Sequence, residues 1–254
     1  MPRLLVISAH AADFCSRAGG AIIKYVRRAS PTRIVDLSVG ERGESNELWL
    51  EQPSITLEQV QQIRKHEAEQ AAARMGAEIR FHNWLDHPMT LREERLVTLV
   101  DEIREMRADI LLTHHNSDPL NLDHEYVAKA VTEACFLAQF PGLRTQFPPT
   151  PSPALYFFEA TIPMTELTGF KPNFYIDITD VFELKMQALR EFKSQSFLPA
   201  AYERYAAWRG AQAKTMSGNQ NIQYAEAFEQ YLPSVGDEFP LTGRYHALSS
   251  NPHR

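Results

Sequence analysis

The sequence predicts an α/β protein in which helices cover both faces of a mostly parallel sheet. Short aliphatic runs rich in β-branched residues alternate with segments of helical periodicity, and the alternation repeats along most of the chain. The chain has 254 residues, of which 44% are hydrophobic, and this is enough for a substantial core. We therefore expect a three-layer α/β/α, Rossmann-like architecture.

The first half of the chain supplies the repeating units. Residues 3–9 and 33–39 are predicted as strands and residues 21–29 as the helix between them, a β-α-β unit that implies a parallel sheet. A long helix over 56–76 begins at Thr56 and ends at Gly76. The alternation continues with a strand at 78–84, a helix at 91–107, a strand at 109–114 and a helix at 123–139.

The second half begins with a Pro-rich break at residues 147–153. Two more strands are predicted at 154–160 and 173–179, followed by a helix at 181–195 and a mostly helical tail to about 233. We expect a single domain over residues 1–254, with 196–254 as a helical C-terminal extension. In such a sheet, ligands bind beyond the carboxyl ends of the strands.

Charge and cysteine content narrow the function classes. The net charge of −6 and the pI near 5.9 provide no basic footprint, so nucleic acid is not expected as a partner. Cys15 and Cys135 are too few for a disulfide framework. The apolar N-terminal run is too short for a signal peptide or a membrane span. We expect a cytoplasmic homo-oligomer with no membrane partner.

Two groups of potential metal ligands follow strands that we expect to be neighbours. His10 and Asp13 come after the first strand, and Asp118, Asp123 and His124 come after the strand at 109–114. Catalytic zinc takes three imidazole or carboxylate ligands and keeps one open position, which His10, Asp13 and His124 satisfy. Asp118 and Asp123 are suited to hold the remaining ring nitrogens of the histidines. Taken singly, each motif is also typical of helix caps and packing residues.

The order of several motifs resembles the PIG-L/LmbE superfamily of zinc-dependent de-N-acetylases. The resemblance covers residues 3–195 and includes AHAADFCSRAGG (9–20), GERGES (40–45), RKHEAEQAAARMGAE (64–78), NLDH (121–124) and NFYIDITDVFELKMQALREFKSQ (173–195). It implies an LmbE-like fold, one zinc ion per chain (another divalent metal being an alternative), and metal-binding roles for the residues at the matching positions, His10, Asp13 and His124.

Two residues depart from the deacetylase pattern. Ala12 stands where the deacetylases have the aspartate that serves as general base, and Asn121 stands where they usually have a histidine. Losing a positioned base lowers a rate by about 10²–10⁴-fold. A deacetylase with this sequence is therefore expected to be a poor one, unless a base comes from another part of the chain.

The HAAD and GERGES variants resemble one branch of the superfamily, the 4-oxalomesaconate hydratases of gallate and protocatechuate breakdown. This implies a metal-dependent hydratase that adds water to an unsaturated oxo-carboxylic acid, 4-oxalomesaconate in that branch. The partner would be a small anionic polycarboxylate. Two alternatives stay open. One is a zinc-dependent N-deacetylase of an N-acetyl sugar or related amide, and the other is a catalytically silent metal-binding relative.

Five residues are candidates for the chemistry of hydration. Glu44 is the candidate general base or acid in place of the missing carboxylate, although it also has Arg42 nearby as a partner. Arg17 and Arg42 are candidates for binding substrate carboxylates, because guanidinium groups bind carboxylates bidentately. His114 and Asn121 are expected to line the substrate pocket.

One departure concerns the hydratase branch itself. That branch has a histidine shortly after a Phe-Glu pair, whereas this chain reads FFEATIP over residues 157–163, with Ala160 and Thr161 at that place. If the histidine is the proton donor of the branch, this chain uses another acid or a related substrate.

Overall fold

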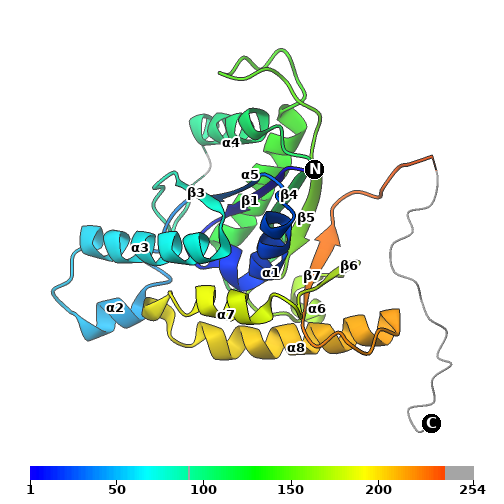
Figure 1. The fold of residues 1–254 in the computed structure, drawn as a ribbon. Helices are drawn as coiled ribbons and strands as arrows, with labels where there is room; N and C mark the ends of the chain where they lie inside the picture. Colours follow the sequence, from blue (N-terminus) through cyan, green and yellow to red (C-terminus); the bar gives the residue numbers. More distant parts are fainter. Residues whose placement is uncertain (91, 238–254) are drawn as a thin grey trace, which may run out of the picture.

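The computed structural model describes residues 1–90 and 92–237, and in this part of the chain it shows one seven-stranded sheet with helices on both faces (Figure 1). The strand order is β3-β2-β1-β4-β5-β7-β6. The strands are β1 (Leu4–Ser8), β2 (Thr32–Asp36), β3 (Glu78–Phe81), β4 (Ile110–His114), β5 (Ala154–Phe158), β6 (Phe174–Asp177) and β7 (Ala225–Gln230). Residue 91 of the predicted 91–107 helix and residues 238–254 of the predicted extension lie outside the described part.

The helices form two layers. One face of the sheet is covered by α1 (Asp13–Arg27), α3 (Leu57–Met75), α7 (Phe182–Leu189) and α8 (Leu198–Ser217), and the other by α4 (Glu93–Met106) and α5 (Leu122–Leu137) (Figure 1). The short helices α2 (Asn46–Glu51) and α6 (Thr165–Thr168) and the 3₁₀ turn η1 (Lys193–Gln195) belong to the connections. An apolar cluster fills each interface between sheet and helices. The three-layer α/β/α prediction is confirmed.

The sheet topology creates a crevice beside β1. Five strands, β3 to β5 in the order above, run parallel, and β1 pairs with β2 on one side and β4 on the other. The chain thus adds β2 and β3 on one side of β1 and then β4 and β5 on the other. Loops that leave the carboxyl ends of β1 and β4 diverge at this point, which is where parallel sheets bind ligands.

Helix α1 begins earlier than the sequence pattern predicts. The predicted helix covered 21–29, whereas the observed one runs from Asp13 to Arg27. Its first eleven residues are all buried, so the alternation of polar and apolar residues that marks a surface helix is absent there. Small residues allow this burial: a Cβ on Gly20 would stand 2.4 Å from Cγ2 of Ile178.

The C-terminal extension is not wholly helical, which corrects the prediction for 196–254. Helix α8 is present, but residues 225–230 form β7, which pairs antiparallel with both β5 and β6. The segment YAEAFEQ contains alanine and glutamate, which favour helix in isolation, and pairing on both edges overrides that preference. The helix predicted at 181–195 is also shorter, ending at Leu189 before the η1 turn.

The long helix α3 follows its sequence signals closely. Thr56 caps its start, with a reciprocal capping box formed with Gln59, and Gly76 ends it in the left-handed conformation at φ 75°. Its buried Arg64 and Glu67 face the η1 turn, so this helix is the support on which part of the site rests.

Candidate metal and substrate site

Four loops meet at the carboxyl ends of the parallel strands. His10 and Asp13 follow β1, Glu44 comes from the loop after β2, and His124 lies in the first turn of α5 after β4. Thr161 follows β5 and reaches the same place, because its backbone N–H donates to Oδ2 of Asp118 at 2.7 Å. The topology therefore assembles residues that are far apart in the sequence.

Three donor atoms form a triangle of nearly equal sides. Nδ1 of His10, Oδ2 of Asp13 and Nε2 of His124 lie 3.3 Å from one another along each side. A tetrahedral zinc ion with bonds of about 2.0–2.1 Å requires ligand atoms about 3.3–3.4 Å apart. The geometry and the nitrogen and oxygen chemistry of this group, which we call the donor triad, therefore fit a zinc-like ion, and Glu44 lies close enough to belong to the same group of potential ligands.

Carboxylates support both histidines of the donor triad. Oδ2 of Asp118 lies 2.8 Å from Nδ1 of His124, and Oδ2 of Asp123 lies 3.3 Å from Nε2 of His10. Such partners fix the ring orientation of metal-binding histidines. Burial opposes ionisation of Asp118, but the hydrogen bond with His124 outweighs it and lowers the pKa of Asp118 to about 2. This carboxylate is therefore ionised at neutral pH.

The ring of His87 stacks on the ring of His10. The two ring centroids lie 5.4 Å apart, and Nδ1 of His87 is 3.6 Å from Oδ2 of Asp123. Two backbone N–H groups, of His87 and Met89, also donate to the carboxylate of Asp123. The loop after β3 thus closes the site behind His10.

Glu44 lies beside the donor triad in a tightly turned loop. Gly40, at φ 73°, turns the chain so that a Cβ there would stand 2.9 Å from Cβ of Glu44. Oε1 of Glu44 is 3.3 Å from Nδ1 of His10. Burial alone would raise the pKa of Glu44, but the charges of His10, His124 and Arg17 lower it, so its carboxylate is ionised at neutral pH.

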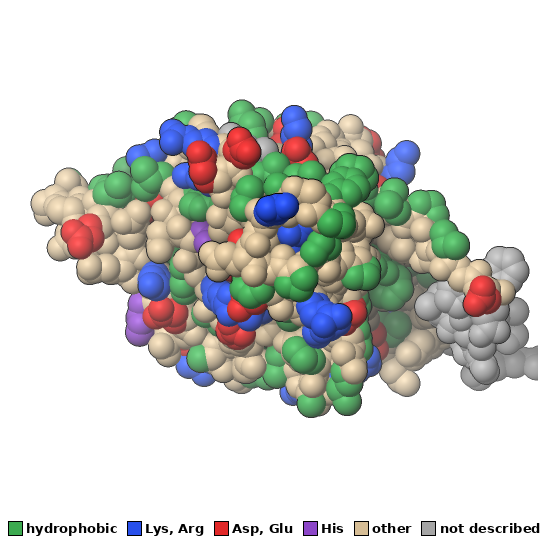
Figure 2. All heavy atoms as spheres, turned by 90° about the horizontal axis from the view of Figure 1, so that it is seen from above, with side chains coloured by type: hydrophobic (Ala, Val, Ile, Leu, Met, Phe, Trp, Pro, Cys, Tyr) green, Lys and Arg blue, Asp and Glu red, His purple; other side chains and the backbone are tan. Residues whose placement is uncertain are grey.

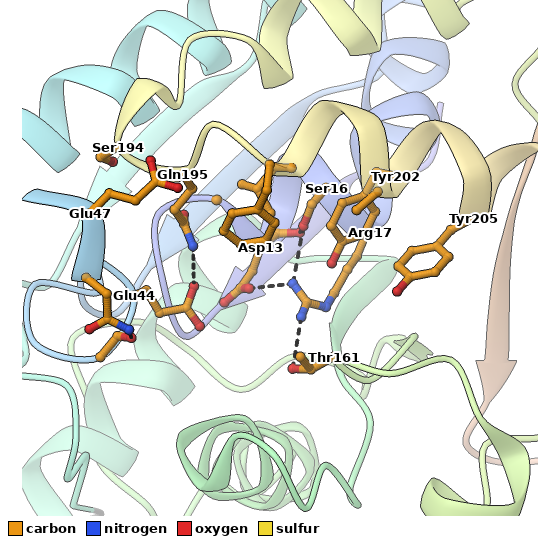
Figure 3. Close-up of a pocket in the computed structure, with 16 residues that line it drawn as sticks. Asp13, Ser16, Arg17, Glu44, Glu47, Thr161, Ser194, Gln195, Tyr202 and Tyr205 are labelled. Carbon is orange, nitrogen blue, oxygen red and sulfur yellow. Dashed lines mark hydrogen bonds and ion pairs between the residues drawn. The ribbon is translucent and has the colours of Figure 1, made fainter.

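A cavity of about 250 Å³ opens beside Asp13 and Glu44 (Figure 3). Glu44 and Gln195 lie on one side of Asp13, and Arg17, Tyr202 and Tyr205 lie on the other (Figure 3). Helix α8 supplies the two tyrosines, so the C-terminal part of the chain builds one wall. The cavity therefore combines a carboxylate, a cation and phenolic hydroxyl groups beside Asp13 of the donor triad.

Arg17 is fixed against Asp13. Its Nη1 donates to Oδ1 of Asp13 at 2.5 Å, its Nε donates to the carbonyl of Glu159 at 3.0 Å, and its Nη2 donates to Oγ1 of Thr161 at 3.4 Å. Ser16 accepts a further bond from Nη1 at 3.2 Å. A guanidinium has five N–H donors, so one remains for a ligand in the cavity.

The other predicted site residues have different surroundings. Asn121 donates from Nδ2 to Oε1 of Glu44 at 2.8 Å. His114 lies inside the site, where Nε2 accepts the backbone N–H of Ala9 at 2.9 Å; burial and the charge of His124 lower its pKa to about 3, so it is neutral. Arg42 is exposed and donates to the carbonyl of Asp86, outside the cavity lining.

Several cavity residues carried no clear signal in the sequence. Gln195, Tyr202 and Tyr205 all line the cavity, and none belongs to a short motif with a known mechanism. Gln195 stands in the stretch FKSQ, at the end of the longer segment 173–195 that resembles the family. Position in the fold, rather than residue pattern, brings these side chains to Glu44 and Arg17.

The face of the molecule seen in Figure 2 carries charges of both signs. Figure 2 shows positive and negative side chains interspersed over one face of the molecule, with no basic stripe on that face. Among residues 1–90 and 92–237, no helix is both long enough and apolar enough to cross a membrane.

Comparison with known proteins identifies the family. The model of the PIG-L family, described as GlcNAc-PI de-N-acetylase, matches residues 5–135. The chain belongs to the PIG-L family. Within it, a 4-oxalmesaconate hydratase from Pseudomonas putida strain KT2440 is 36% identical over 234 residues, which are 91% of this chain and 90% of that protein.

Two solved structures agree with the fold. The 4-carboxy-2-hydroxymuconate hydratase GalB from Pseudomonas putida KT2440 superimposes with a TM-score of 0.88 at 35% identity, over 94% of this chain and all of that one. The N,N'-diacetylchitobiose deacetylase from Pyrococcus horikoshii has a TM-score of 0.72 at 23% identity, over 89% of this chain and 82% of that one. The deacetylase comparison shows a shared fold. At 35–36% identity over more than 90% of the chain, the similar proteins are hydratases.

Proposed function

We propose that this protein is a metal-dependent hydratase that adds water to an unsaturated oxo-carboxylic acid, 4-oxalomesaconate or a near analogue, in the breakdown of aromatic acids. The observation that carries the proposal is the Glu44 carboxylate beside the donor triad, with Ala12 at the neighbouring position in the cavity. The two hydratases with 35–36% identity over most of the chain support it.

Ala12 argues against deacetylation by the usual family route. Its methyl group lines the cavity next to Asp13, and a methyl group cannot serve as an acid or a base. The carboxylate available at this point is that of Glu44, which enters from the neighbouring loop after β2. The base therefore approaches from a different direction than a base at position 12 would. This suits a substrate whose reacting atom is a carbon of a double bond and not the carbonyl carbon of an N-acetyl group.

Glu44 is proposed as the general base. Its ionised carboxylate accepts a proton from the attacking water while the remaining hydroxide bonds to one carbon of the double bond, and the π electrons move toward the conjugated ketone. The proton is then returned to the other carbon. When zinc is bound at His10, Asp13 and His124, it supplies a Lewis acid that activates water or polarises the substrate oxygen.

Arg17 and Tyr202 are proposed to bind substrate carboxylates on the opposite side of the cavity. Arg17 has one uncommitted N–H donor. Burial raises the pKa of Tyr202, so its hydroxyl stays protonated and can donate to an anion. Asn121, which also binds Glu44, and His114 are proposed to complete the shape of the site.

Four further features belong to this proposal. The metal is zinc, one ion per chain. Residues 1–254 form one domain, whose C-terminal part contributes both a cavity wall and β7. The protein acts in the cytoplasm, in keeping with two free cysteines in the described residues. It assembles as a homo-oligomer.

The decisive experiment follows the absorbance of the enone. Zinc-loaded protein mixed with 4-oxalomesaconate should remove the absorbance, and a chelator should abolish this activity, with readdition of zinc restoring it. Acetate release from N-acetylglucosaminyl compounds is measured in parallel. Acetate release without loss of the enone absorbance would reject the hydratase in favour of the deacetylase. If the zinc-loaded protein shows neither activity, the catalytically silent metal-binding relative is favoured.

A further inference from the structure

The carboxylate of Glu44 is held at both oxygens by side-chain amides. Nδ2 of Asn121 donates to Oε1 at 2.8 Å, and Nε2 of Gln195 donates to Oε2 at 3.1 Å. Figure 3 shows the amide of Gln195 directed at Glu44 from the chain segment above it. A carboxylate held at only one oxygen could rotate about its last bond, whereas two donors on opposite oxygens fix its plane.

The backbone that carries Gln195 is itself anchored. Ser194, the preceding residue, donates from its backbone N–H to Oε1 of Glu67 at 2.9 Å and from Oγ to Oε2 of Glu67 at 2.5 Å. Nη1 of Arg64 donates to Oγ of Ser194 at 2.8 Å. Arg64 is fully buried, so the η1 turn is fastened to α3 by groups that do not exchange freely with water.

Gln195 is buried, and only the N–H side of its side-chain amide has a hydrogen-bond partner in the described residues. The residue is 6% exposed, and its Oε1 atom has no hydrogen-bond partner among the described residues. A buried amide that served packing alone would leave this acceptor unpaired at a cost in stability. Its N–H donor is therefore committed to Glu44, and the residue also lines the cavity beside that carboxylate.

We propose that Gln195 is a positioning residue that orients the Glu44 carboxylate toward the attacking water. The inference rests on the proposed role of Glu44 as the general base. Gln195 does not itself exchange a proton. It acts by fixing Oε2 of Glu44, so that Oε1 of Glu44 stays beside the donor triad.

A double-mutant cycle tests the inference. Gln195→Met keeps the length of the side chain and removes the N–H donor, and Gln195→Glu keeps its shape but places an oxygen against Oε2. Both single variants should lower kcat by about 10–100-fold, as expected for a lost hydrogen bond to a charged group, with KM within about twofold of the wild type. In the Glu44→Gln background, Gln195→Met should change kcat by less than about twofold.

Three controls separate positioning from folding. Thermal unfolding and zinc content should stay at the wild-type level in both variants. Ser196→Ala, on the next residue of the same turn, contacts Glu47 rather than Glu44 and should leave kcat unchanged. A crystal structure of zinc-loaded Gln195→Met should show Glu44 in a different or mixed rotamer.

The outcomes are distinct. An unchanged kcat in Gln195→Met, or losses that simply add in the Glu44→Gln background, would overturn the role of Gln195. A wild-type protein that releases acetate and does not hydrate the oxo-acid would overturn the proposed function instead. The same cycle on acetate release would then decide the role of Gln195. If the wild type catalyses neither reaction, an unchanged Glu44 rotamer in the Gln195→Met structure overturns the inference, and a displaced one supports it.

Discussion

At the scale of single residues, the chemistry we propose depends on two positions. Position 12 has no carboxylate, and Glu44 supplies one from another loop. Ala12 is 2% exposed and lines the cavity, so a carboxylate at this position would lie within the site. Glu44 reaches the donor triad from the next loop and is held there by Asn121 and Gln195. A base supplied by another loop approaches a bound substrate from another direction. The same metal site can therefore serve two different reactions.

Replacing Glu44 with glutamine tests this assignment. Glu44→Gln keeps the hydrogen-bonding size of the side chain but cannot accept the proton, so kcat for hydration should fall by about 10²–10⁴-fold. Metal content should be unchanged, as measured by elemental analysis. Glu51→Gln, an exposed change on α2, is the matched control and should have wild-type kinetics. A fully active Glu44→Gln enzyme would remove this residue from the mechanism.

His124 is expected to be essential for metal binding. His124→Ala removes one side of the donor triad, so zinc content should drop from one ion per chain to a small fraction of that value. The control is His66→Ala, which removes an exposed imidazole on α3 and should retain the metal. Stoichiometric zinc in His124→Ala would show that the ion binds elsewhere.

Asp36 gives the protein a dependence of stability on pH. Burial raises the pKa of Asp36 well above its usual value, whereas in the unfolded chain the pKa is about 3.9. The folded state therefore binds this proton more tightly. The resulting stabilisation is full below about pH 4 and is lost as the pH rises toward the folded-state pKa.

Asp36→Asn removes this dependence because the amide resembles the protonated acid. Each tenfold difference in proton affinity corresponds to about 1.4 kcal/mol of unfolding free energy. The melting temperature of Asp36→Asn relative to the wild type should therefore rise between pH 4 and pH 7 in thermal unfolding experiments. A difference that is constant across this range would mean that Asp36 titrates normally.

At the scale of elements, a buried ion pair joins α1, α7 and β7. Nζ of Lys185 lies 2.7 Å from Oε1 of Glu226 and donates to the carbonyl of Ser16 at 2.8 Å. The carboxylate of Glu226 also accepts the backbone N–H groups of Gly20 and Ala21, each at 2.8 Å. Because α1 begins at Asp13, this ion pair holds the helix that presents part of the donor triad.

Lys185→Met should destabilise the protein because it leaves Glu226 buried without its counter-charge. Removing one partner of a buried pair costs about 3–5 kcal/mol of unfolding free energy. Adding Glu226→Gln should recover part of the loss, since the amide is neutral. Denaturant unfolding of the two variants measures both effects. Equal stability of the single and double variants would show that the charge of Glu226 is not the cause.

Elements with local signals could be predicted, and elements defined by long-range pairing could not. The capping residues of α3 and the aliphatic strands β1, β2 and β4 gave boundaries close to those observed. The start of α1 was missed because burial hides its periodicity, and β7 was missed because its strand character comes from β5 and β6.

The residues of the candidate site also fall into those that the sequence could predict and those that it could not. The donor triad and its supporting aspartates belong to short motifs that follow strands, so they could be named from the sequence. Gln195 and the tyrosines of α8 could not, since their distance along the chain from Glu44 conceals their proximity in space. Arg42 is two residues from Glu44 in the sequence, yet its side chain turns to Asp86.

At the scale of the whole molecule, β7 connects the parallel part of the sheet to β6. It pairs with β5 on one edge and with β6 on the other, and Phe228 is opposite both Phe158 and Phe174. Without β7, β6 has no neighbour in the observed sheet and β5 becomes an open edge.

A chain that ends after Ser217 should therefore not reach the native state, although it keeps the donor triad, Glu44 and all the cavity residues named above. We expect little soluble protein and no cooperative unfolding transition by circular dichroism. The control is a chain that ends after Asp237, which retains β7 and should fold. A folded, metal-binding protein from the shorter chain would show that β7 is dispensable.

The place of β7 in the sequence also governs the order of events during synthesis. The ribosome delivers both histidines of the metal site, then α7 and α8, and only afterwards the strand that joins β5 to β6. Until Gln230 has emerged, the nascent protein presents an unpaired strand edge to other chains. Slow translation over residues 218–230 would therefore lower the yield of soluble enzyme without changing the turnover of the molecules that fold.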